Sequence, residues 1–413
     1  MTTQPVQSGA TDSAAPEAIP AGAILCLSLG AFGSGVSLRV NDALLPRLAE
    51  QFAIPLSTAA QVISYFAIAY GLSQLLFGPL GDRFGKYRVI AWACAACALT
   101  ATLCGMAPDF GLLTLARALA GATAAAIIPL AMAWIGDVVP YDKRQPVLAR
   151  FLIGQILGLS AGVWLGGFAA DHLNWRLPYF AIGGLFAAVS IALFMLNRRL
   201  PAHARRMQPA SGSALRRIAR DFGQVLARPW ARQVLVTVFL EGAFLYGPFA
   251  FIASHLHHDF GVSLSLAGSL VMLFGFGGVL YALSSTALVA RLGEVGLVRG
   301  GGVILSAALL GVALAPAWWW AIPACLFAGL GFYMLHNTLQ INATQMAPER
   351  RGAAVSAFAS CFFLGQSAGV VLAGALADHI GTAHMIAVGA LGVLALALNF
   401  GRLRSNSTLA QHR

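Results

Sequence analysis

Charged residues are scarce in this chain. Only 10% of its 413 residues are Asp, Glu, Lys or Arg, whereas roughly a quarter is usual in a soluble domain. Hydrophobic residues make up 58% of the sequence. A soluble protein of this length, which would form one or two domains, has no way to bury that much apolar surface. Lipid is therefore the expected solvent for most of the chain.

Acidic residues are scarcer still. The chain has 15 Asp and Glu against 26 Lys and Arg, a net charge of +11. In a soluble protein such an excess would suggest a nucleic-acid partner. In a membrane protein, the positions of the basic residues decide what the excess means.

Cysteine is limited to six residues, and all of them lie in apolar stretches. Cys94 and Cys97 form a CxxC pair, but no second pair accompanies them, so we expect packing and not metal or redox chemistry. Residues 1–20 contain no Lys or Arg. This segment lacks the basic region of a cleaved signal peptide and is predicted to be a disordered cytoplasmic tail.

Apolar runs near the ~20 residues that cross a bilayer recur along the chain. Since backbone polar groups in hydrocarbon must be satisfied locally, each run is predicted to be a helix. The predicted spans are 22–46, 57–80, 88–107, 110–136, 149–170, 177–197, 233–255, 264–289, 298–315, 318–343, 353–376 and 382–400.

The basic residues orient these spans. Of the 26 Lys and Arg, 22 fall after even-numbered spans or in the C-terminal tail, and nine arginines lie between Arg198 and Arg232. The opposite loops contain only Arg47 and Arg176. By the positive-inside rule both termini are predicted to be cytoplasmic. The basic excess is thus explained by topology, and a nucleic-acid partner is not expected.

The two halves of the chain are related. Residues 160–173 align without gaps to 367–380 with nine of 14 identical, at an offset of 207. The sequence therefore predicts an all-α membrane protein of twelve transmembrane helices in two pseudo-symmetric bundles, 21–197 and 233–400. A basic cytoplasmic linker, 198–232, joins them, and a cytoplasmic tail, 401–413, follows. Parallel repeats of this kind are typical of transporters with a midplane site.

The loop after the second span carries the most specific motif. It contains the residues Gly78, Gly81, Asp82, Arg83, Gly85, Lys86 and Arg88. This pattern resembles the GxLxDRxGRR loop of the major facilitator superfamily, with Lys86 in place of the usual arginine. The resemblance extends over the whole chain in helix number, linker position and repeat.

That resemblance implies a conformational latch in this loop. Asp82 is expected to accept hydrogen bonds from nearby arginines and to face the positive N-terminal end of the helix near residue 353. The alternative is an ordinary basic loop that only fixes topology. The counterpart in the second half, Ala290–Gly293, lacks the acid.

Two further motifs resemble elements of this family. Arg117, with Gly121 one turn later, matches the family's RxxxG element, which is associated with proton coupling; snorkelling to the outer interface is the alternative. The second motif, a helix-packing motif of small residues in the fifth span, resembles that of the family's antiporters, with Val163 in place of the family's proline. Its glycines are Gly158, Gly162, Gly166 and Gly167.

Two acids fall within the predicted spans. Glu241 lies near mid-bilayer, where burial of a carboxyl group favours its neutral form, so we expect it to bind and release protons. A neutral glutamic acid hydrogen-bonded in the core is the alternative. Asp42 and Pro46 match a DxxxP element of the family's drug:proton antiporters, and Arg39 is placed to pair with Asp42. A structural ion pair is the alternative there.

Other polar residues in the spans are candidates for a substrate cavity: Gln61, Tyr65, Tyr246, His336, Asn337 and Gln340. Hydrogen bonding between helices is the alternative for each of them. His255, His257 and His258 are too weak a pattern to predict a metal site.

The sequence thus favours a monomeric, multi-pass transporter of the bacterial inner membrane. We expect proton-coupled efflux of small amphiphilic drugs or metabolites, with the proton gradient as energy source and no cofactor. A proton symporter that imports a nutrient, and a transport-inactive sensor or scaffold, are the alternatives. No clustered nucleophile, base or metal set points to an enzyme.

Overall fold

The structure is a computed structural model that describes residues 20–205 and 214–411. All regular secondary structure in these ranges is helical. The first half comprises α1 (Ala21–Arg39), α2 (Leu45–Phe52), α3 (Leu56–Ala59), α4 (Gln61–Phe84), α5 (Lys86–Met106), α6 (Phe110–Ala124), α7 (Ile127–Val138), α8 (Tyr141–His172) and α9 (Leu177–Arg199).

After α9 come a short 3-10 turn (Ala202–Arg205) and α10 (Ala214–Leu226). The second half comprises α11 (Pro229–Glu241), a π-helical turn (Gly242–Tyr246), α12 (Gly247–Phe249), α13 (Ile252–Phe260), α14 (Leu264–Ala313), α15 (Ala321–Gln345) and α16 (Arg351–Gln411). Short 3-10 turns precede α15 (Trp318–Trp320) and α16 (Pro348–Arg350).

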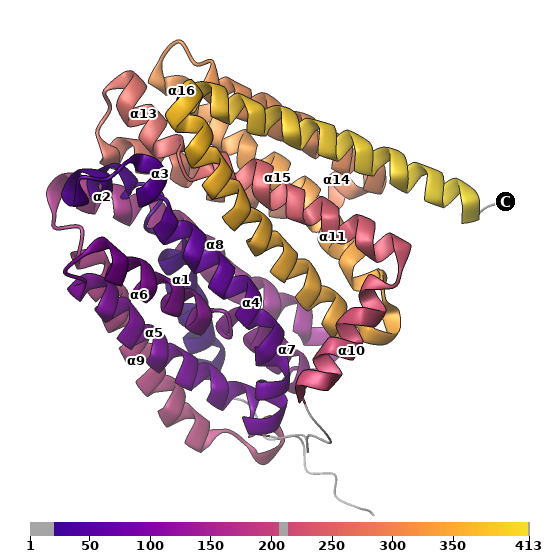
Figure 1. Cartoon of the computed structure of the whole chain (residues 1–413). Coiled ribbons are helices and arrows are strands. Elements are labelled where there is room, and N and C mark those ends of the chain that lie inside the picture. The colour runs from indigo at the N-terminus through magenta and orange to yellow at the C-terminus, as the bar shows by residue number, and fades with distance from the viewer. Residues whose placement is uncertain (1–19, 206–213, 412–413) are drawn as a thin grey trace, which may run out of the picture.

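Ten stretches of helix in the described residues are long and apolar enough to cross a membrane. Two of them, α14 and α16, are pairs of helices that meet at a kink, at Gly293 and Gly381. Both glycines have a positive φ with ψ near 180°, a conformation that is essentially restricted to glycine. In Figure 1 the chain of α16 turns at such a kink, and its yellow C-terminal part diverges from the preceding part.

Several helix ends differ from the sequence prediction. The first span, expected at 22–46, ends at Arg39, and α2 begins anew with Pro46 in its first turn, where proline is favoured. The fourth span is divided between α6 and α7. The expected linker, 198–232, contains α10, and α16 continues to Gln411 where a tail was expected. Most of the N-terminal tail, residues 1–19, lies outside the described residues.

Glycines allow the helices of the first bundle to pack backbone against backbone. Gly158, Gly162 and Gly166 of α8 recur every fourth residue and lie against the main chain of α1 and of Val40 just after it, where an added Cβ would clash. The second bundle repeats the arrangement: Gly365 and Gly369 of α16 lie against the main chain of Phe239 and Ala243. Since Gly365 and Gly369 follow Gly158 and Gly162 by 207 residues, the sequence repeat is also a structural repeat.

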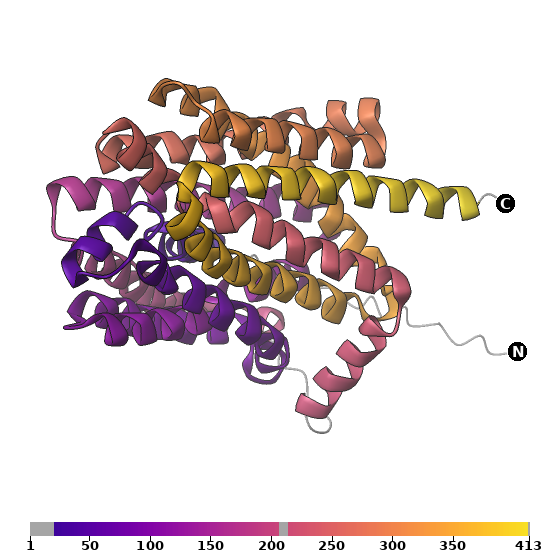
Figure 2. The same cartoon turned by 45° about the horizontal axis from the view of Figure 1, so that its top comes forward.

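The two bundles meet along two seams, α4 with α16 and α8 with α14. Figure 1 shows the indigo-to-magenta bundle and the orange-to-yellow bundle converging near α2, α3 and α13. Figure 2 shows the same bundles from another side, with α10 beside the second one. An ion pair between Asp221 of α10 and Arg350 ties α10 to the start of α16.

Candidate functional site

Glu241 and His336 form a pair at the end of α11, in which the acid is buried and the imidazole is half-buried. The carboxyl group of Glu241 is fully buried, and its Oε2 lies 2.9 Å from Nδ1 of His336 on α15. The other oxygen, Oε1, has no hydrogen-bond partner in the described residues. An unpartnered buried carboxyl oxygen is costly, so this atom is available to bind a proton or a polar ligand.

Aromatic rings surround this pair. The His336 ring stacks on Phe332 at 4.9 Å between centroids and contacts Phe362 at 4.7 Å. Phe332 and Phe362 also contact Tyr246 on the π-helical turn, each at 5.5 Å. The acid and the imidazole therefore lie in apolar surroundings, where electrostatic interactions are stronger than in water.

Arg39 connects the two bundles at the centre of the molecule. Its guanidinium lies 3.8 Å from the centroid of the Tyr246 ring, which belongs to the other bundle. The same group pairs with Asp42 at 3.3 Å, and both side chains are almost completely buried. The Oδ1 atom of Asp42 has no partner in the described residues. The predicted Arg39–Asp42 pair is thus present, and it contacts the aromatic cluster.

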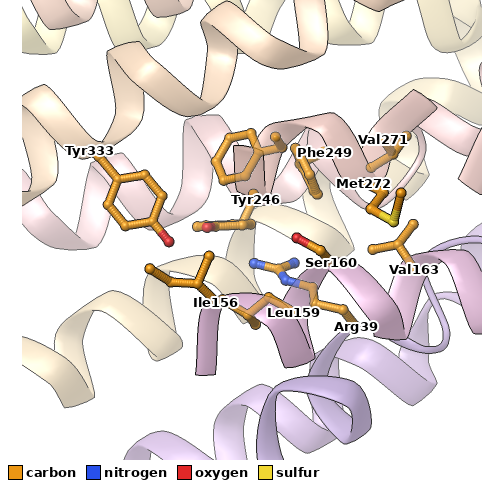
Figure 3. A pocket seen from close by; sticks show the side chains of 12 residues that line it. Arg39, Ile156, Leu159, Ser160, Val163, Tyr246, Phe249, Val271, Met272 and Tyr333 are labelled. Atoms are coloured by element: carbon orange, nitrogen blue, oxygen red, sulfur yellow. The ribbon is translucent and has the colours of Figure 1, made fainter. Parts of the chain in front are cut away.

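A small cavity lies next to Arg39, as Figure 3 shows. Its volume is about 20 Å³, enough for roughly one water molecule. In Figure 3 the Arg39 guanidinium lies beside Tyr246 and Ser160, and the Tyr333 hydroxyl points toward the same space. Residues of both bundles therefore line the cavity, with α1 and α8 on one side and α14, α15 and the π-helical turn on the other.

Arg117 is buried and held by backbone carbonyls. It donates to the carbonyl of Val62 at 3.2 Å and to that of Ser37 at 3.0 Å, and it lies over the Phe66 ring at 4.2 Å. The Asn41 amide, oriented with its oxygen toward Arg117, accepts from it at 3.2 Å. Since Arg117 is 1% exposed, it does not extend to an interface, which argues against the snorkelling alternative.

The remaining predicted cavity residues are not brought together. Tyr65 and Gln340 are exposed, Gln61 and Asn337 are half-buried, and none of the four lines the cavity. Sequence reasoning missed Ser160, Phe274 and Tyr333. These residue types are ordinary in an apolar helix. Only the packing of the two bundles reveals which such residues face the centre of the molecule.

The predicted latch loop makes its contacts within the first bundle. Lys86 pairs with Asp82 at 3.2 Å and with Asp137 of α7 at 2.7 Å. Gly85 has a positive φ of 87°, which permits the sharp turn between α4 and α5. Asp82 makes no hydrogen bond or ion pair with α16 in the described residues. The cross-bundle contact that the resemblance implied is absent from this conformation.

Polar contacts between the bundles link α4 to α16 and α8 to α14. Ser64 of α4 donates to the carbonyl of Ser367 at 2.9 Å, and Ser360 donates to that of Gly71 at 2.7 Å. Asp171, at the end of α8, accepts from two backbone N–H groups at the start of α14. No group of three or more His, Cys, Asp or Glu side chains in residues 20–205 and 214–411 could hold a metal ion.

Helices that span a membrane, two bundles related by a repeat, and buried charges at their junction define a multi-pass membrane transporter. A sequence profile of the Major Facilitator Superfamily matches residues 27–370. The chain therefore belongs to the Major Facilitator Superfamily.

Known relatives agree with this assignment. The uncharacterized MFS-type transporter YceJ of Bacillus subtilis is 25% identical over 86% of this chain and 89% of its own length. The probable sugar efflux transporter of Pasteurella multocida is 23% identical, covering 89% and 88%. Among solved structures, a mutant of the nucleoside transporter NupG superposes with a TM-score of 0.75 at 14% identity, covering 92% of this chain and 98% of NupG.

Proposed function

We propose that this transporter is a proton-coupled exporter of small amphiphilic molecules in the bacterial inner membrane. The observation that carries the proposal is the Glu241–His336 pair, which lies among aromatic rings and whose carboxyl oxygen Oε1 has no hydrogen-bond partner in the described residues. A carboxyl group in such surroundings can exchange its proton when the surrounding charges or water access change. The adjoining rings provide an apolar surface for the substrate.

Coupling follows from the position of this pair between the two bundles. Tyr246 contacts Phe362 beside His336 and also stacks on Arg39 of the first bundle. Movement of one bundle against the other would separate Arg39 from Tyr246 and change the charge near Glu241. Proton binding and bundle movement are thereby linked, which is the requirement for secondary active transport.

The membrane topology is part of the proposal. Counting the kinked helices α14 and α16 as two crossings each gives twelve crossings. With the basic loops in the cytoplasm, the contacts near α2, α3 and α13 close the periplasmic side. One relative is described as a probable sugar efflux transporter, which supports export and extends the candidate substrates to hydroxylated compounds that stack on aromatic rings.

The test is transport of a fluorescent amphiphile, such as ethidium, in proteoliposomes with an imposed pH gradient. Replacing Glu241 by glutamine (Glu241→Gln) removes the exchangeable proton and keeps the hydrogen-bonding shape. We expect it to abolish pH-driven transport, roughly a tenfold loss or more, while binding of the amphiphile persists.

Glu50→Gln is the matched control, because Glu50 is exposed on α2 and, within residues 20–205 and 214–411, pairs only with Arg47. It should transport like the unmodified protein. Unchanged pH-driven transport in Glu241→Gln would exclude Glu241 as the coupling site. The direction of flux under an imposed gradient separates export from import: a symporter would accumulate substrate together with protons.

A further inference from the structure

The end of α8 is joined to the start of α14 by one carboxylate. Oδ1 of Asp171 accepts a hydrogen bond from the Leu264 N–H at 3.2 Å, and Oδ2 accepts one from the Ser265 N–H at 2.6 Å. The hydroxyl of Ser263 accepts from the next N–H, that of Leu266, at 3.2 Å. The first N–H groups of a helix lack intrahelical acceptors, so two of those in α14 are satisfied by a residue of the other bundle.

This contact lies at the end of a closely packed seam. The main chain of α14 at Leu264 lies so near Gly167 that no side chain would fit there, and Ser265 donates to the Gly167 carbonyl at 3.4 Å. Further along, an added Cβ at Gly268 would lie 2.8 Å from the carbonyl oxygen of Val163. The carboxylate thus reaches the helix start only while these two backbones are in contact.

The internal repeat supplies a natural comparison. At the offset of 207, Asp171 corresponds to Asp378, and Leu264 corresponds to Ser57. The backbones also approach at this second seam, where an added Cβ at Gly374 would lie 3.1 Å from Ser57. However, Asp378, which is exposed like Asp171, makes no hydrogen bond or ion pair with the described residues.

The start of α3 next to Asp378 also lacks a side-chain cap, since Pro55 precedes it. Close packing of the repeat therefore does not by itself produce the carboxylate contact. The contact is a separate feature of the seam between α8 and α14.

We propose that Asp171 is a positioning residue that latches the end of the transporter near α2, α3 and α13 in its closed state. The carboxylate favours this state because it is close to the positive N-terminus of α14. When the bundles rock apart, water replaces Asp171 at the Leu264 and Ser265 N–H groups. This proposal rests on the proposed function only in taking transport as the reason why the bundles move. The effect of Asp171 on conformation can be measured without any substrate.

The experiment measures the distance across this end of the full-length protein in nanodiscs, by electron–electron double resonance. Spin labels at Gln51 of α2 and His258 of α13, both exposed, report the separation of the bundles in a background without the native cysteines. Asp171→Ala should raise the open-to-closed ratio roughly three- to tenfold, as expected for the loss of two partly exposed hydrogen bonds. Asp171→Ser, which retains one acceptor, should lie between.

Asp378→Ala is the matched control and should leave the distance distribution unchanged. An Asp171→Ala protein that is less heat-stable but keeps the original distance distribution would reduce Asp171 to a structural role and overturn the proposal. Equal shifts in the two variants would also overturn it, because they would show a general effect of surface charge. Loss of coupling in Glu241→Gln tests the proposed function separately, since this distance measurement requires neither protons nor substrate.

Discussion

The backbone and aromatic rings can satisfy a buried charge without any acidic partner. Arg117 shows this most clearly, because its hydrogen bonds go to the carbonyls of Val62 and Ser37 and its flat face lies on Phe66. A planar guanidinium can make such bonds in several directions while stacking on a ring. A lysine ammonium cannot do both.

We therefore expect Arg117→Lys to lower the stability of the protein. The loss should be about 2–3 kcal/mol, because at least one carbonyl is left without a donor and the stacking is lost. Thermal unfolding in detergent, followed by light scattering and tryptophan fluorescence, measures the change. Arg47→Lys, at an exposed ion pair on α2, is the control and should be neutral.

Sequence reasoning could find the buried charges but not their partners. Arg117, Asp42 and Glu241 are identifiable because a charge in an apolar span is costly and rare. Glu241 and His336 are 95 residues apart, and nothing in one sequence shows which faces of their two helices meet. The carbonyl acceptors of Arg117 are invisible to sequence reasoning, because every residue has one.

At the scale of elements, glycine positions determine how closely the helices approach. Gly158 lies against the Phe32 carbonyl of α1, whereas Gly184 in α9 has open space around it. Both glycines are helical, so alanine substitutions at the two positions differ mainly in the atoms that the new Cβ contacts.

Gly158→Ala should therefore destabilise the protein by about 1–3 kcal/mol through overpacking. Gly184→Ala should be neutral or stabilising by up to about 1 kcal/mol, because alanine favours helix over glycine. Melting temperatures of the two purified variants give the comparison. If both variants melt alike, backbone contact between α8 and α1 does not limit stability.

The kink of α16 gives a second prediction at this scale. Gly381 has φ 80° and ψ 162°, a region that other residues adopt only at a cost of about 1–3 kcal/mol. We expect Gly381→Ala to lower the melting temperature and the yield of monodisperse protein. Gly352→Ala, also in α16 but with open space and ordinary dihedrals, should have no such effect.

The sequence predicted the existence of the membrane helices better than their ends. Hydrophobic length identifies a span, but the break between α6 and α7 lies in an apolar stretch, and the turn after Arg39 lies in a stretch whose few polar residues did not exclude a span. The kinks at Gly293 and Gly381 fall where the sequence predicted loops, because basic or polar residues interrupt the apolar runs. The glycines there were not recognised as the residues that turn the chain.

On the scale of the whole molecule, the relation between the bundles defines a conformational state. Ser64 and Ser367 are 303 residues apart in sequence, and their hydroxyl oxygens are 3.0 Å apart across the seam between α4 and α16. The proposed movement of one bundle against the other requires this seam to open. The sequence repeat predicted two bundles, but it contains no information on which side of them is closed, because one sequence serves every state.

A disulfide across this seam should stop transport. In a background without the native cysteines, Ser64→Cys combined with Ser367→Cys is expected to cross-link on mild oxidation, and the cross-linked protein should lose nearly all transport in proteoliposomes. Reduction should restore it. Either cysteine alone is the control. Full transport by quantitatively cross-linked protein would show that this seam stays closed throughout the cycle.

The π-helical turn at Gly242–Tyr246 contains about one residue per turn more than the α-helix around it. Each α-helical residue rotates the next side chain by about 100°, so the residues after this turn face a direction that an unbroken helix would not give them. Tyr246 is the last residue of the turn, and its ring lies under Arg39. Shortening the chain here by one residue would restore a regular helix and aim the ring away from the arginine. The contact between Arg39 and Tyr246 thus depends on the number of residues in the π-helical turn as much as on the identity of either side chain.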